Sequence, residues 1–364
     1  MRLAICSVGE LFGGVERQIL DLCTFLRRRG LGDPLVTLFH DRELAAQLRR
    51  GGLAPVILQG GSRYDWRLVA RLTGLLAEHR IDVVHAHGYK ATIAAALAKR
   101  RLGFRLVKTE HGKREATLAH PVAWLKARAN LGLDGFLTRR YADQVLYVTH
   151  DIQAHFAAPH RGLVRATVHN GIDPLSAAAT TRPADLPADR FNVALVGRVT
   201  AVKGIPLALA AMAGDEVPPE VHLVVIGTGP LLASLQREAA ERGLSDRVSF
   251  LGFRQNIYDY LAHVDVLLMP SYHEGLPYTL LEAMSLARPV VASRVGGLAE
   301  VLRDGETGLL VEPGATDQIA AAVGRLARDR DLGRALGRAA QDLQARRFTL
   351  DVMGQGCLDA YVGA

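Results

Sequence analysis

Short apolar runs rich in β-branched residues alternate along the chain with segments in which apolar residues recur at helical spacing. Between the first two runs, an apolar residue recurs every three or four positions, which predicts an amphipathic helix; these residues are Val15, Ile19, Leu22, Cys23 and Leu26. Each short run predicts a buried strand. The runs occupy residues 2–8, 34–39, 55–58, 82–85, 105–109, 144–149, 164–169, 192–196, 222–226, 248–251, 265–269, 289–292 and 308–311. Such alternation is typical of parallel sheets with crossover helices, so the sequence predicts an α/β fold.

The stretch from residue 174 to residue 190 interrupts this alternation. It holds three prolines and a run of Ala, Thr and Ser without an apolar period, which is typical of a linker between domains. A length of 364 residues also favours two domains over one. We therefore expect two doubly wound Rossmann-like domains, residues 1–173 and 191–345, followed by helical residues 346–364. Parallel sheets bind ligands at the carboxyl ends of their strands, so we expect the chemistry in a cleft between the two domains.

Composition limits the class of protein further. Hydrophobic residues make up 49% and charged residues 22% of the chain, which is typical of a globular protein and excludes a disordered one. The three cysteines, Cys6, Cys23 and Cys357, have no spacing typical of a disulfide framework or a zinc site, which favours the reducing cytoplasm. No apolar run reaches the roughly 18 residues of a membrane span, and the first residues predict a strand rather than a signal peptide.

The net charge of +7 is unevenly distributed. Residues 1–173 carry 26 Lys and Arg against 15 Asp and Glu, a net charge of +11, whereas the remainder carries 18 against 22, a net charge of −4. The basic half would attract an anionic partner, such as an acidic glycan, a nucleic acid or an anionic membrane surface. The alternative is an arginine-rich composition without a specific partner, because 38 of the 44 basic residues are Arg.

A dense group of polar residues follows the strand expected at residues 265–269. Gly275 and Pro277 predict a turn into a helix there, and the amides and dipole of a helix N-terminus can hold phosphate or sugar oxygens. Glu274 lies at the turn and Glu282 about two helical turns further on. Two carboxylates so placed suit two hydroxyl-bearing groups of one elongated ligand, such as the sugar and the ribose of a nucleotide sugar. Incidental acids on a surface helix are the alternative.

Two cations follow another strand of the second half. Arg198 and Lys203 lie in one glycine-bounded turn after residues 192–196, and such a pair suits a diphosphate whose negative charge grows as it leaves. Solvated loop charges are the alternative.

Glycine-containing turns follow two more of the predicted strands. Gly227-Thr228-Gly229-Pro230 lacks the third glycine of a dinucleotide-binding fingerprint, and on its own it is as typical of close packing. Gly13 and Gly14 precede the first predicted helix, whose N-terminus could approach a phosphate or a sugar.

Taken in this order, the motifs resemble those of the family 4 retaining glycosyltransferases, which have the GT-B fold of two Rossmann-like domains. The resemblance extends over nearly the whole chain. The matching motifs are Gly13-Gly14-Val15-Glu16, Val84-His85-Ala86-His87, Thr109-Glu110-His111-Gly112, His169-Asn170-Gly171-Ile172-Asp173, Val196-Gly197-Arg198 with Lys203, Gly227-Thr228-Gly229-Pro230, Glu274 with Glu282, Gly296-Gly297 and Gly305-Glu306-Thr307-Gly308-Leu309-Leu310. The resemblance implies transfer of a hexose-type sugar, with retention at the anomeric carbon, from a nucleotide diphosphate sugar to an acceptor hydroxyl.

The resemblance also implies roles for individual residues. Arg198 and Lys203 would bind the donor diphosphate, and Glu282 would bind the ribose. Glu274 would bind the transferred sugar. The other residues implied at the donor site are Gly13, Gly14, Gly227, Gly275 and Leu276, together with Phe253 and Arg254 beside the base.

A histidine near the sugar and the leaving group is a further feature of the family, and His111 matches it. A buried packing histidine is the alternative for this position. His85 and His87 alternate at a strand end, and we expect at most one of them to face the ligand while both support the structure.

Similar enzymes hold no metal, so the resemblance implies no cofactor besides the donor substrate. The Asp-x-Asp motif at Asp329-Arg330-Asp331 lies among arginines in a helical stretch, which opposes Mg²⁺ binding. In the mechanism favoured for similar enzymes, the departing phosphate oxygen accepts the acceptor proton on the same face, and the site closes to exclude water. The family pattern also has the last helix, here around residues 350–361, pack back on the first domain.

A basic and apolar stretch follows His111. Its members are Lys113, Arg114, Leu118, Trp124, Leu125, Lys126, Arg128, Leu131, Leu133, Phe136, Leu137, Arg139 and Arg140. Such a stretch can lie on an anionic membrane, which would place the protein at the inner face of the cell membrane, or it can be a helix whose apolar face is core. The acceptor implied by the resemblance is a sugar or a lipid-linked sugar in the assembly of cell-surface polysaccharide, lipopolysaccharide or glycolipid.

Two other functions remain open at this point. A sugar-nucleotide epimerase of similar fold would convert a donor without an acceptor. A non-catalytic anion-binding protein would explain the charge, but it would not explain the carboxylates of Glu274 and Glu282. The sequence has no motif typical of nucleic-acid binding.

Overall fold

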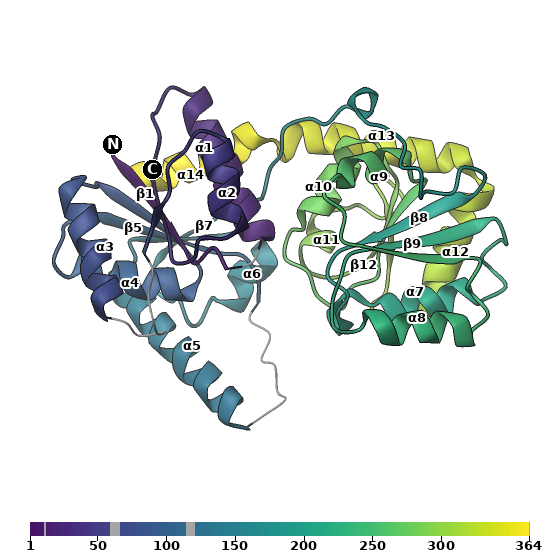
Figure 1. Cartoon of the computed structure of the whole chain (residues 1–364), viewed down its shortest axis with the longest axis horizontal. Helices are drawn as coiled ribbons and strands as arrows, with labels where there is room; N and C mark the ends of the chain where they lie inside the picture. Colours follow the sequence, from purple (N-terminus) through teal and green to yellow (C-terminus); the bar gives the residue numbers. More distant parts are fainter. Residues whose placement is uncertain (11, 59–65, 114–120, 364) are drawn as a thin grey trace. The chain divides into compact units, whose positions relative to one another are not determined.

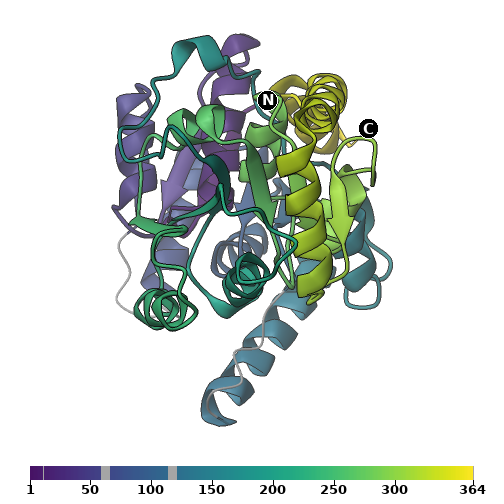
Figure 2. The same cartoon turned by 90° about the vertical axis from the view of Figure 1, so that its right-hand side faces the viewer.

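The computed structural model describes residues 1–10, 12–58, 66–113 and 121–363, which form two compact units. The first unit comprises Met1–Asn170 and Leu350–Ala364, and the second comprises Gly171–Thr349. Strands and helices alternate in both units (Figures 1 and 2), which confirms the predicted α/β fold.

A seven-stranded sheet in the order β3-β2-β1-β4-β5-β6-β7 forms the centre of the first unit, and its neighbouring strands are parallel. The strands are β1 (Leu3–Ser7), β2 (Leu35–Leu38), β3 (Val56–Ile57), β4 (Val83–His87), β5 (Arg105–Glu110), β6 (Gln144–Tyr147) and β7 (Val164–Thr167). Each of them overlaps one of the predicted runs, because a strand covered on both faces is apolar at nearly every position.

Helices cover both faces of this sheet (Figure 1). On one face, Ile5 of β1 packs in a core with residues of α1 (Gly14–Arg28), α2 (Glu43–Arg50) and α14 (Leu350–Val362). On the other face, Ala4 packs in a core with residues of α3 (Trp66–Glu78), α4 (Tyr89–Lys99) and α5 (Pro121–Tyr141). A short helix, α6 (His150–His155), follows β6. Figures 1 and 2 both show α5 extending beyond the body of this unit.

The last helix, α14, belongs to the first unit although the whole second unit precedes it in the chain. Met353 and Cys357 are buried in the same core as Phe25 of α1. The Tyr361 hydroxyl lies 2.7 Å from Nδ1 of His85, and Nε of Arg105 donates to the carbonyl of Ala360. Apolar burial and two polar contacts therefore hold α14 on this unit.

The second unit has a six-stranded parallel sheet in the order β10-β9-β8-β11-β12-β13. Its strands are β8 (Phe191–Val196), β9 (Val221–Ile226), β10 (Val248–Gly252), β11 (Val266–Met269), β12 (Val290–Ser293) and β13 (Leu309–Val311). Helices α7 (Ile205–Met212), α8 (Leu232–Glu241) and α12 (Thr316–Arg328) pack on one face. Helices α9 (Ile257–His263), α10 (Tyr278–Ser285) and α11 (Gly296–Val301) pack on the other, and α13 (Arg330–Arg347) lies against α10.

The unit boundaries differ from those that the sequence predicts. The first unit ends at Asn170 rather than at residue 173, and the chain returns to it at Leu350 rather than at residue 346. Residues 174–190 are part of the second unit rather than a free linker. Leu186 is buried beside Tyr260, and a 3₁₀ turn, η1 (Ala177–Ala179), lies within the same stretch. The prolines of residues 174–190 correctly predicted irregular backbone, but this irregular segment packs on the second unit.

Candidate active site

Loops at the carboxyl ends of the strands in the second unit carry most of the predicted site residues. Arg198 and Lys203 follow β8, Gly227 follows β9, Phe253 follows β10, and Glu274 follows β11. Because all these strands are parallel, their carboxyl ends lie at one edge of the sheet. The fold therefore places these loops at the same edge of the second unit.

Backbone contacts hold the first two loops against each other. Gly227 has a φ of 144°, and a Cβ atom at this position would lie 1.8 Å from the carbonyl oxygen of Gly197. The amide of Val199 donates to the carbonyl of Thr228 at 2.9 Å. Glycine is required at position 227 by this close approach and by its backbone conformation. In the described structure, Gly227 thus shapes the loop that carries Arg198.

Lys203 and Glu274 meet in the next pair of loops. Lys203 lies in the 3₁₀ turn η2 (Ala201–Lys203), and Gly204 follows it with a φ of 64°. A Cβ atom on Gly204 would lie 2.0 Å from the carbonyl oxygen of Pro270, so the two loops are in direct contact. Nζ of Lys203 donates to Oε1 of Glu274 at 2.5 Å, and Oγ of Ser271 donates to the same oxygen at 2.7 Å.

Burial strengthens this ion pair relative to one on the open surface. The side chain of Glu274 is 9% exposed and that of Lys203 is 19% exposed, so water screens the pair only in part. The structure therefore brings a cation implied at the diphosphate into contact with a carboxylate implied at the sugar. Arg198 is exposed on the same loop, and within the described part of the chain its side chain has no hydrogen bond or ion pair, although its carbonyl accepts from the amide of Thr200 at 2.9 Å.

Glu282 lies on α10, in the helix that the sequence predicts after Glu274. The residue is 6% exposed, and Leu276, just before the helix, is 4% exposed. The amide of Gly297, near the start of α11, donates to the carbonyl of Glu274 at 3.4 Å. The side chain of Glu282 is thus buried, whereas an incidental acid on a surface helix would be exposed.

The segment implied at the nucleotide base contains one exposed and one engaged side chain. Phe253 is 69% exposed. Arg254 instead donates from Nη2 to Asp185 at 2.9 Å and from Nε to the hydroxyl of Tyr260 at 3.0 Å. The Tyr260 hydroxyl donates to Asp185 at 2.6 Å. Arg254 therefore ties residues 174–190 to α9. Asp185 was not predicted as its partner, because it lies in the stretch expected to be a linker.

In the first unit, Gly13 and Gly14 lie at the start of α1 and are exposed. The amide of Gly13 donates to Oε2 of Glu16 at 3.0 Å, so a carboxylate of the same helix already uses it. Burial raises the pKa of the Glu16 carboxyl, and two backbone hydrogen bonds oppose this effect.

His85, His87 and His111 form a cluster at the carboxyl ends of β4 and β5. The ring centroids of His85 and His87 lie 4.2 Å apart, and Nδ1 of His87 lies 2.9 Å from Nε2 of His111. The expectation that at most one of His85 and His87 faces the ligand treated them as lying on opposite faces of the strand. Residues two apart in a strand lie on the same face. Nδ1 and Nε2 of His85 contact the hydroxyls of Tyr361 and Thr109, each at 2.7 Å.

Burial keeps this cluster neutral. It lowers the pKa of His85 to about 3, with a smaller effect from nearby His111, and it lowers the pKa of His111 to about 4. The pKa of His87 is also well below its usual value, mainly because of burial. At neutral pH the three imidazoles are therefore uncharged, and His111 can offer or accept a hydrogen bond rather than act as a cation.

A buried ion cluster beside His111 was not predicted. Lys108 is fully buried, and its Nζ contacts Oε1 of Glu110 at 2.6 Å and Oδ2 of Asp134 at 2.7 Å. Oγ1 of Thr138 accepts from the same ammonium at 3.2 Å. These contacts join β5 to α5. A lysine within an apolar strand was the available signal, but its partners on α5 could not be located from spacing.

Part of the basic and apolar stretch lies on α5. Arg114 and Leu118 lie outside the described residues, as do the side chains of Trp124, Leu125 and Lys126. Leu137 is buried in the core, whereas Leu133 is 37% and Phe136 57% exposed. The helix is therefore partly core and partly surface.

The Asp-x-Asp motif is engaged by the protein itself. Oδ1 of Asp329 accepts from the amide of Leu332 at the start of α13, and Asp331 forms an ion pair with Arg334.

None of the helices in the described residues has both the length and the apolar composition of a membrane span.

Two α/β units, each built on a parallel sheet, with cations and carboxylates on the carboxyl-end loops of the second, are the features of a glycosyltransferase with the GT-B fold. Residues 12–174 match the model described as Glycosyltransferase Family 4, and residues 179–343 match that of Glycosyl transferases group 1. The chain therefore belongs to glycosyltransferase family 4, as its motifs predicted. This result gives no support to the epimerase or to the non-catalytic alternative.

Individual relatives agree with this assignment. D-inositol 3-phosphate glycosyltransferase of Mycolicibacterium paratuberculosis is 32% identical over 353 residues, with 87% of this chain and 78% of that protein covered. N-acetyl-alpha-D-glucosaminyl L-malate synthase of Bacillus anthracis is 27% identical over 296 residues, with 78% and 75% covered. The crystal structure of Anabaena HepE in complex with UDP is 24% identical, covers 100% of both chains and has a TM-score of 0.86, which shows a shared fold.

Proposed function

We propose that this glycosyltransferase transfers a hexose from a UDP-hexose to a sugar or lipid-linked sugar acceptor, with retention and without a bound metal. The contact between Lys203 and Glu274 carries the proposal, because it joins a cation and a carboxylate at the carboxyl edge of a parallel sheet. The names of relatives support the donor class: the HepE structures contain UDP or UDP-glucose, and other relatives are named for glycosyl transfer.

The donor diphosphate is assigned to Arg198 and Lys203. Arg198 is exposed and has donors available for a phosphate. The Lys203 ammonium has three donors, of which Glu274 uses one in this structure, so it can bind a phosphate oxygen while it keeps that contact. These two cations would stabilise the charge that develops on the leaving diphosphate, which a metal would otherwise do, and Glu274 already holds Lys203 in position.

The transferred sugar is assigned to Glu274, with the amides of Gly275 and Leu276 beside it. Ser271 and Lys203 hold one carboxylate oxygen of Glu274, and the other oxygen is the one assigned to a sugar hydroxyl. Glu282 is assigned to the ribose hydroxyls. A carboxylate accepts hydrogen bonds at both oxygens, which suits the two hydroxyls of a ribose.

The base is assigned to Phe253 rather than to Arg254. The ring of Phe253 is largely exposed at the end of β10, so a base can stack on it. Arg254 supports this segment through Asp185 and Tyr260.

Retention and the absence of a resident metal form the finer part of the proposal. The departing phosphate oxygen would accept the proton of the acceptor hydroxyl on the same face of the sugar, so no enzymatic base is required. His111 is assigned near the reacting groups as a neutral hydrogen-bonding group, because burial holds its pKa near 4. The carboxylates of Asp329 and Asp331 are engaged by Leu332 and Arg334, which argues against a metal at this motif.

The acceptor is assigned to the basic first unit, and it belongs to the assembly of a cell-surface polysaccharide, lipopolysaccharide or glycolipid. The excess of cations in residues 1–173 favours an anionic acceptor or membrane surface. Leu133 and Phe136, exposed on α5 near Arg139 and Arg140, are the proposed contact with the cytoplasmic face of the membrane. Flotation with anionic vesicles tests this part: binding should weaken as salt rises, and failure to bind would refute the membrane contact alone.

The test of the donor site compares UDP and UDP-glucose binding in three variants. Lys203→Ala should weaken both ligands about tenfold or more, because the diphosphate is common to them. Glu274→Gln should leave UDP nearly unchanged and weaken UDP-glucose. Arg242→Ala is the matched control, since it removes a surface ion pair with Glu238 in the same unit. If the control and Lys203→Ala behaved alike, the assignment would be wrong.

Stereochemistry and metal use need separate assays. NMR of the product formed by the wild-type protein should show the same anomeric configuration as that of the donor, and an inverted product would refute retention. Transfer should persist after dialysis against EDTA, and a loss restored only by Mg²⁺ or Mn²⁺ would refute the metal-free mechanism.

A further inference from the structure

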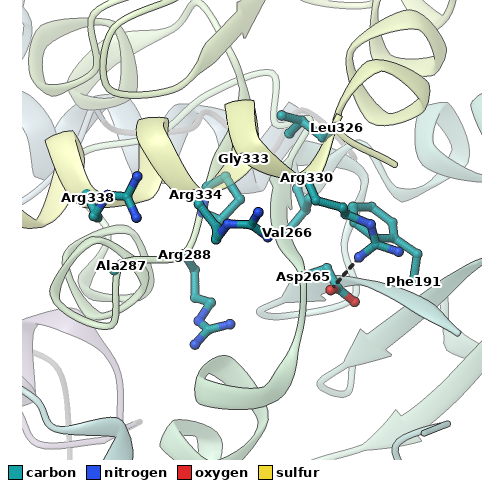
Figure 3. Close-up of a pocket in the computed structure, with 11 residues that line it drawn as sticks. Phe191, Asp265, Val266, Ala287, Arg288, Leu326, Arg330, Gly333, Arg334 and Arg338 are labelled. Atoms are coloured by element: carbon teal, nitrogen blue, oxygen red, sulfur yellow. Dashed lines mark hydrogen bonds and ion pairs between the residues drawn. The ribbon is translucent and has the colours of Figure 1, made fainter. Parts of the chain in front are cut away.

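The second unit contains a pocket of about 450 Å³ that the donor loops do not line (Figure 3). Its lining includes Phe191 at the start of β8, Asp265 just before β11 and Pro289 just before β12. These positions mark the amino edge of the sheet, whereas the donor loops lie at the carboxyl edge. Six residues of β8 separate the two edges, or about 20 Å of extended chain. The pocket is therefore distinct from the proposed donor site.

Arginine dominates the lining of this pocket. Arg330, Arg334 and Arg338 recur every four residues along α13, and Arg288 enters from the turn after α10. Residues four apart lie on the same side of a helix, so the three α13 arginines share one face. Figure 3 shows these three along the helix, above the turn that carries Arg288. Asp265 is the only acidic residue among the pocket's described lining.

Close packing places the arginine face over this turn. A Cβ atom on Gly337 would lie 2.1 Å from the carbonyl oxygen of Ala287, so the helix backbone rests directly on the turn. Ala287 itself has a φ of 54°, a left-handed conformation that costs a non-glycine residue about 1 kcal/mol. The backbone of α13 is thus fixed close to Arg288, and its three arginines line the same cavity.

Arg330 is held in place before any ligand binds. Its Nη1 donates to Oδ1 of Asp265 at 2.8 Å, and its guanidinium carbon lies 4.0 Å from the centroid of the Phe191 ring. The other carboxylate oxygen of Asp265 accepts from the amide of Asn192 at 2.7 Å. Both oxygens of Asp265, the single acid of the described lining, are therefore hydrogen-bonded, and the stacked guanidinium loses little entropy when it contacts an anion.

The other arginines have little compensating negative charge. Arg288 donates to the carbonyls of Leu286 and Val264, which are neutral acceptors, and burial lowers the pKa of its guanidinium. Arg338 is exposed, and among the described residues it has no ion pair. Arg334 pairs with Asp331, whose side chain is 89% exposed, and such surface pairs are weak. The pocket thus has an excess of positive charge that a bound anion would neutralise.

We propose that this pocket binds a phosphate group, carried either by a soluble phosphorylated compound or by a lipid headgroup. Guanidinium groups bind phosphate through paired N–H donors, and a tetrahedral phosphate can accept from several arginines that approach from different directions. A volume of about 450 Å³ accommodates a phosphate together with the group that carries it.

Calorimetric titration with inorganic pyrophosphate tests the proposal. The protein is first saturated with UDP, so that the proposed donor site is filled. The pocket variant is Arg334→Gln with Arg338→Gln. The control variant is Arg346→Gln with Arg347→Gln, which removes the same charge from exposed positions in the last turn of α13, outside the lining. All four sites are exposed, so both variants should keep the melting temperature of the wild-type protein.

We expect the wild-type protein to bind pyrophosphate and the pocket variant to bind it at least about tenfold more weakly. The control variant should stay within about twofold of the wild type, because isolated surface charges contribute little. No binding by the UDP-saturated wild type would overturn the proposal. Equal weakening in both variants would also overturn it, since the effect would then be one of net charge.

Vesicle flotation separates the two sources of the phosphate. Vesicles contain phosphatidylcholine with or without phosphatidylglycerol. If phosphatidylglycerol recruits the wild type and the control but not the pocket variant, the phosphate belongs to a headgroup. If pyrophosphate binds through the pocket and the vesicles recruit all three proteins equally, as a contact through α5 would, or recruit none of them, the phosphate belongs to a soluble compound. Both results require the pocket arginines and both agree with the proposal.

Discussion

Acid should destabilise the first unit because its buried imidazoles are held neutral. His85 has no exposed surface, and burial, with a smaller effect from His111, lowers the pKa of its imidazole to about 3. In the unfolded chain this pKa is about 6.5, so between these values the unfolded state binds more protons than the folded state. The contribution of neutral His85 is therefore fully present above about pH 6.5 and is lost as the pH falls toward 3.

The size of this effect follows from the distance between the pH and the unfolded pKa. At pH 5, protonation of this one side chain in the unfolded state lowers the free energy of unfolding by about 2 kcal/mol. A domain is typically stable by about 5 to 15 kcal/mol, so the loss is measurable. His85→Gln removes the titrating group and leaves an amide that can still reach the hydroxyls of Tyr361 and Thr109. The variant should lose about 2 kcal/mol less than the wild type between pH 8 and pH 5.

Urea unfolding followed by tryptophan fluorescence provides the assay. The chain has two tryptophans, Trp66 and Trp124, and both belong to the first unit, so the signal follows that unit. Free energies of unfolding are compared at pH 8 and pH 5 for the wild type and the variant. If both lost the same free energy over this range, His85 would not be the neutral buried group described above. A pKa near 6.5 measured for His85 by NMR would refute the reasoning directly.

Three further changes test other parts of the structure. Gly227→Ala should lower the free energy of unfolding of the second unit, measured in urea, by several kcal/mol, because the added carbon would collide with a backbone oxygen. Gly243→Ala is the control: its φ is 70° but the space around it is open, so it should lower that free energy by only about 1 kcal/mol, and equal losses would contradict the close approach at Gly227. Lys108→Met should cost about 3 to 5 kcal/mol, since two buried carboxylates lose their cation, and a cost below about 1 kcal/mol in the same assay would count against a charged cluster. Phe253→Ala should weaken UDP binding about tenfold by calorimetry with no change in melting temperature, and unchanged affinity would exclude stacking.

The strands were predictable because both sheets are covered by helices on both faces. Strands such as β8 and β9 are then apolar at nearly every position, and they contrast with the amphipathic helices between them. The unit boundaries were less predictable. Residues 174–190 have the composition of a linker, but Leu186 packs against the second unit, and a single leucine among prolines gives no periodic signal.

The candidate site was predictable as far as strand order and loop position determine it. Lys203 and Glu274 follow β8 and β11, which are neighbours in the sheet, so their loops had to lie near each other. The contacts of Arg254 with Asp185 and of Lys108 with Asp134 depend instead on how helices and loops pack on the sheet. No spacing along the chain encodes such contacts.

The pocket on α13 illustrates the same limit. The four-residue spacing of its three arginines is visible in the sequence, and in isolation it indicates only a basic helix face. Arg288 joins them because Gly337 allows α13 to rest on the turn at Ala287. That contact is a property of the folded unit.

A crystal structure of the protein with UDP-glucose bound tests the central claim most directly. The account predicts that Nζ of Lys203 and the guanidinium of Arg198 lie within hydrogen-bond distance of the diphosphate, with a glucose hydroxyl on Glu274 and the ribose on Glu282. Diphosphate bound away from Lys203, for instance among the arginines of α13, or a sugar without contact to Glu274, would contradict it.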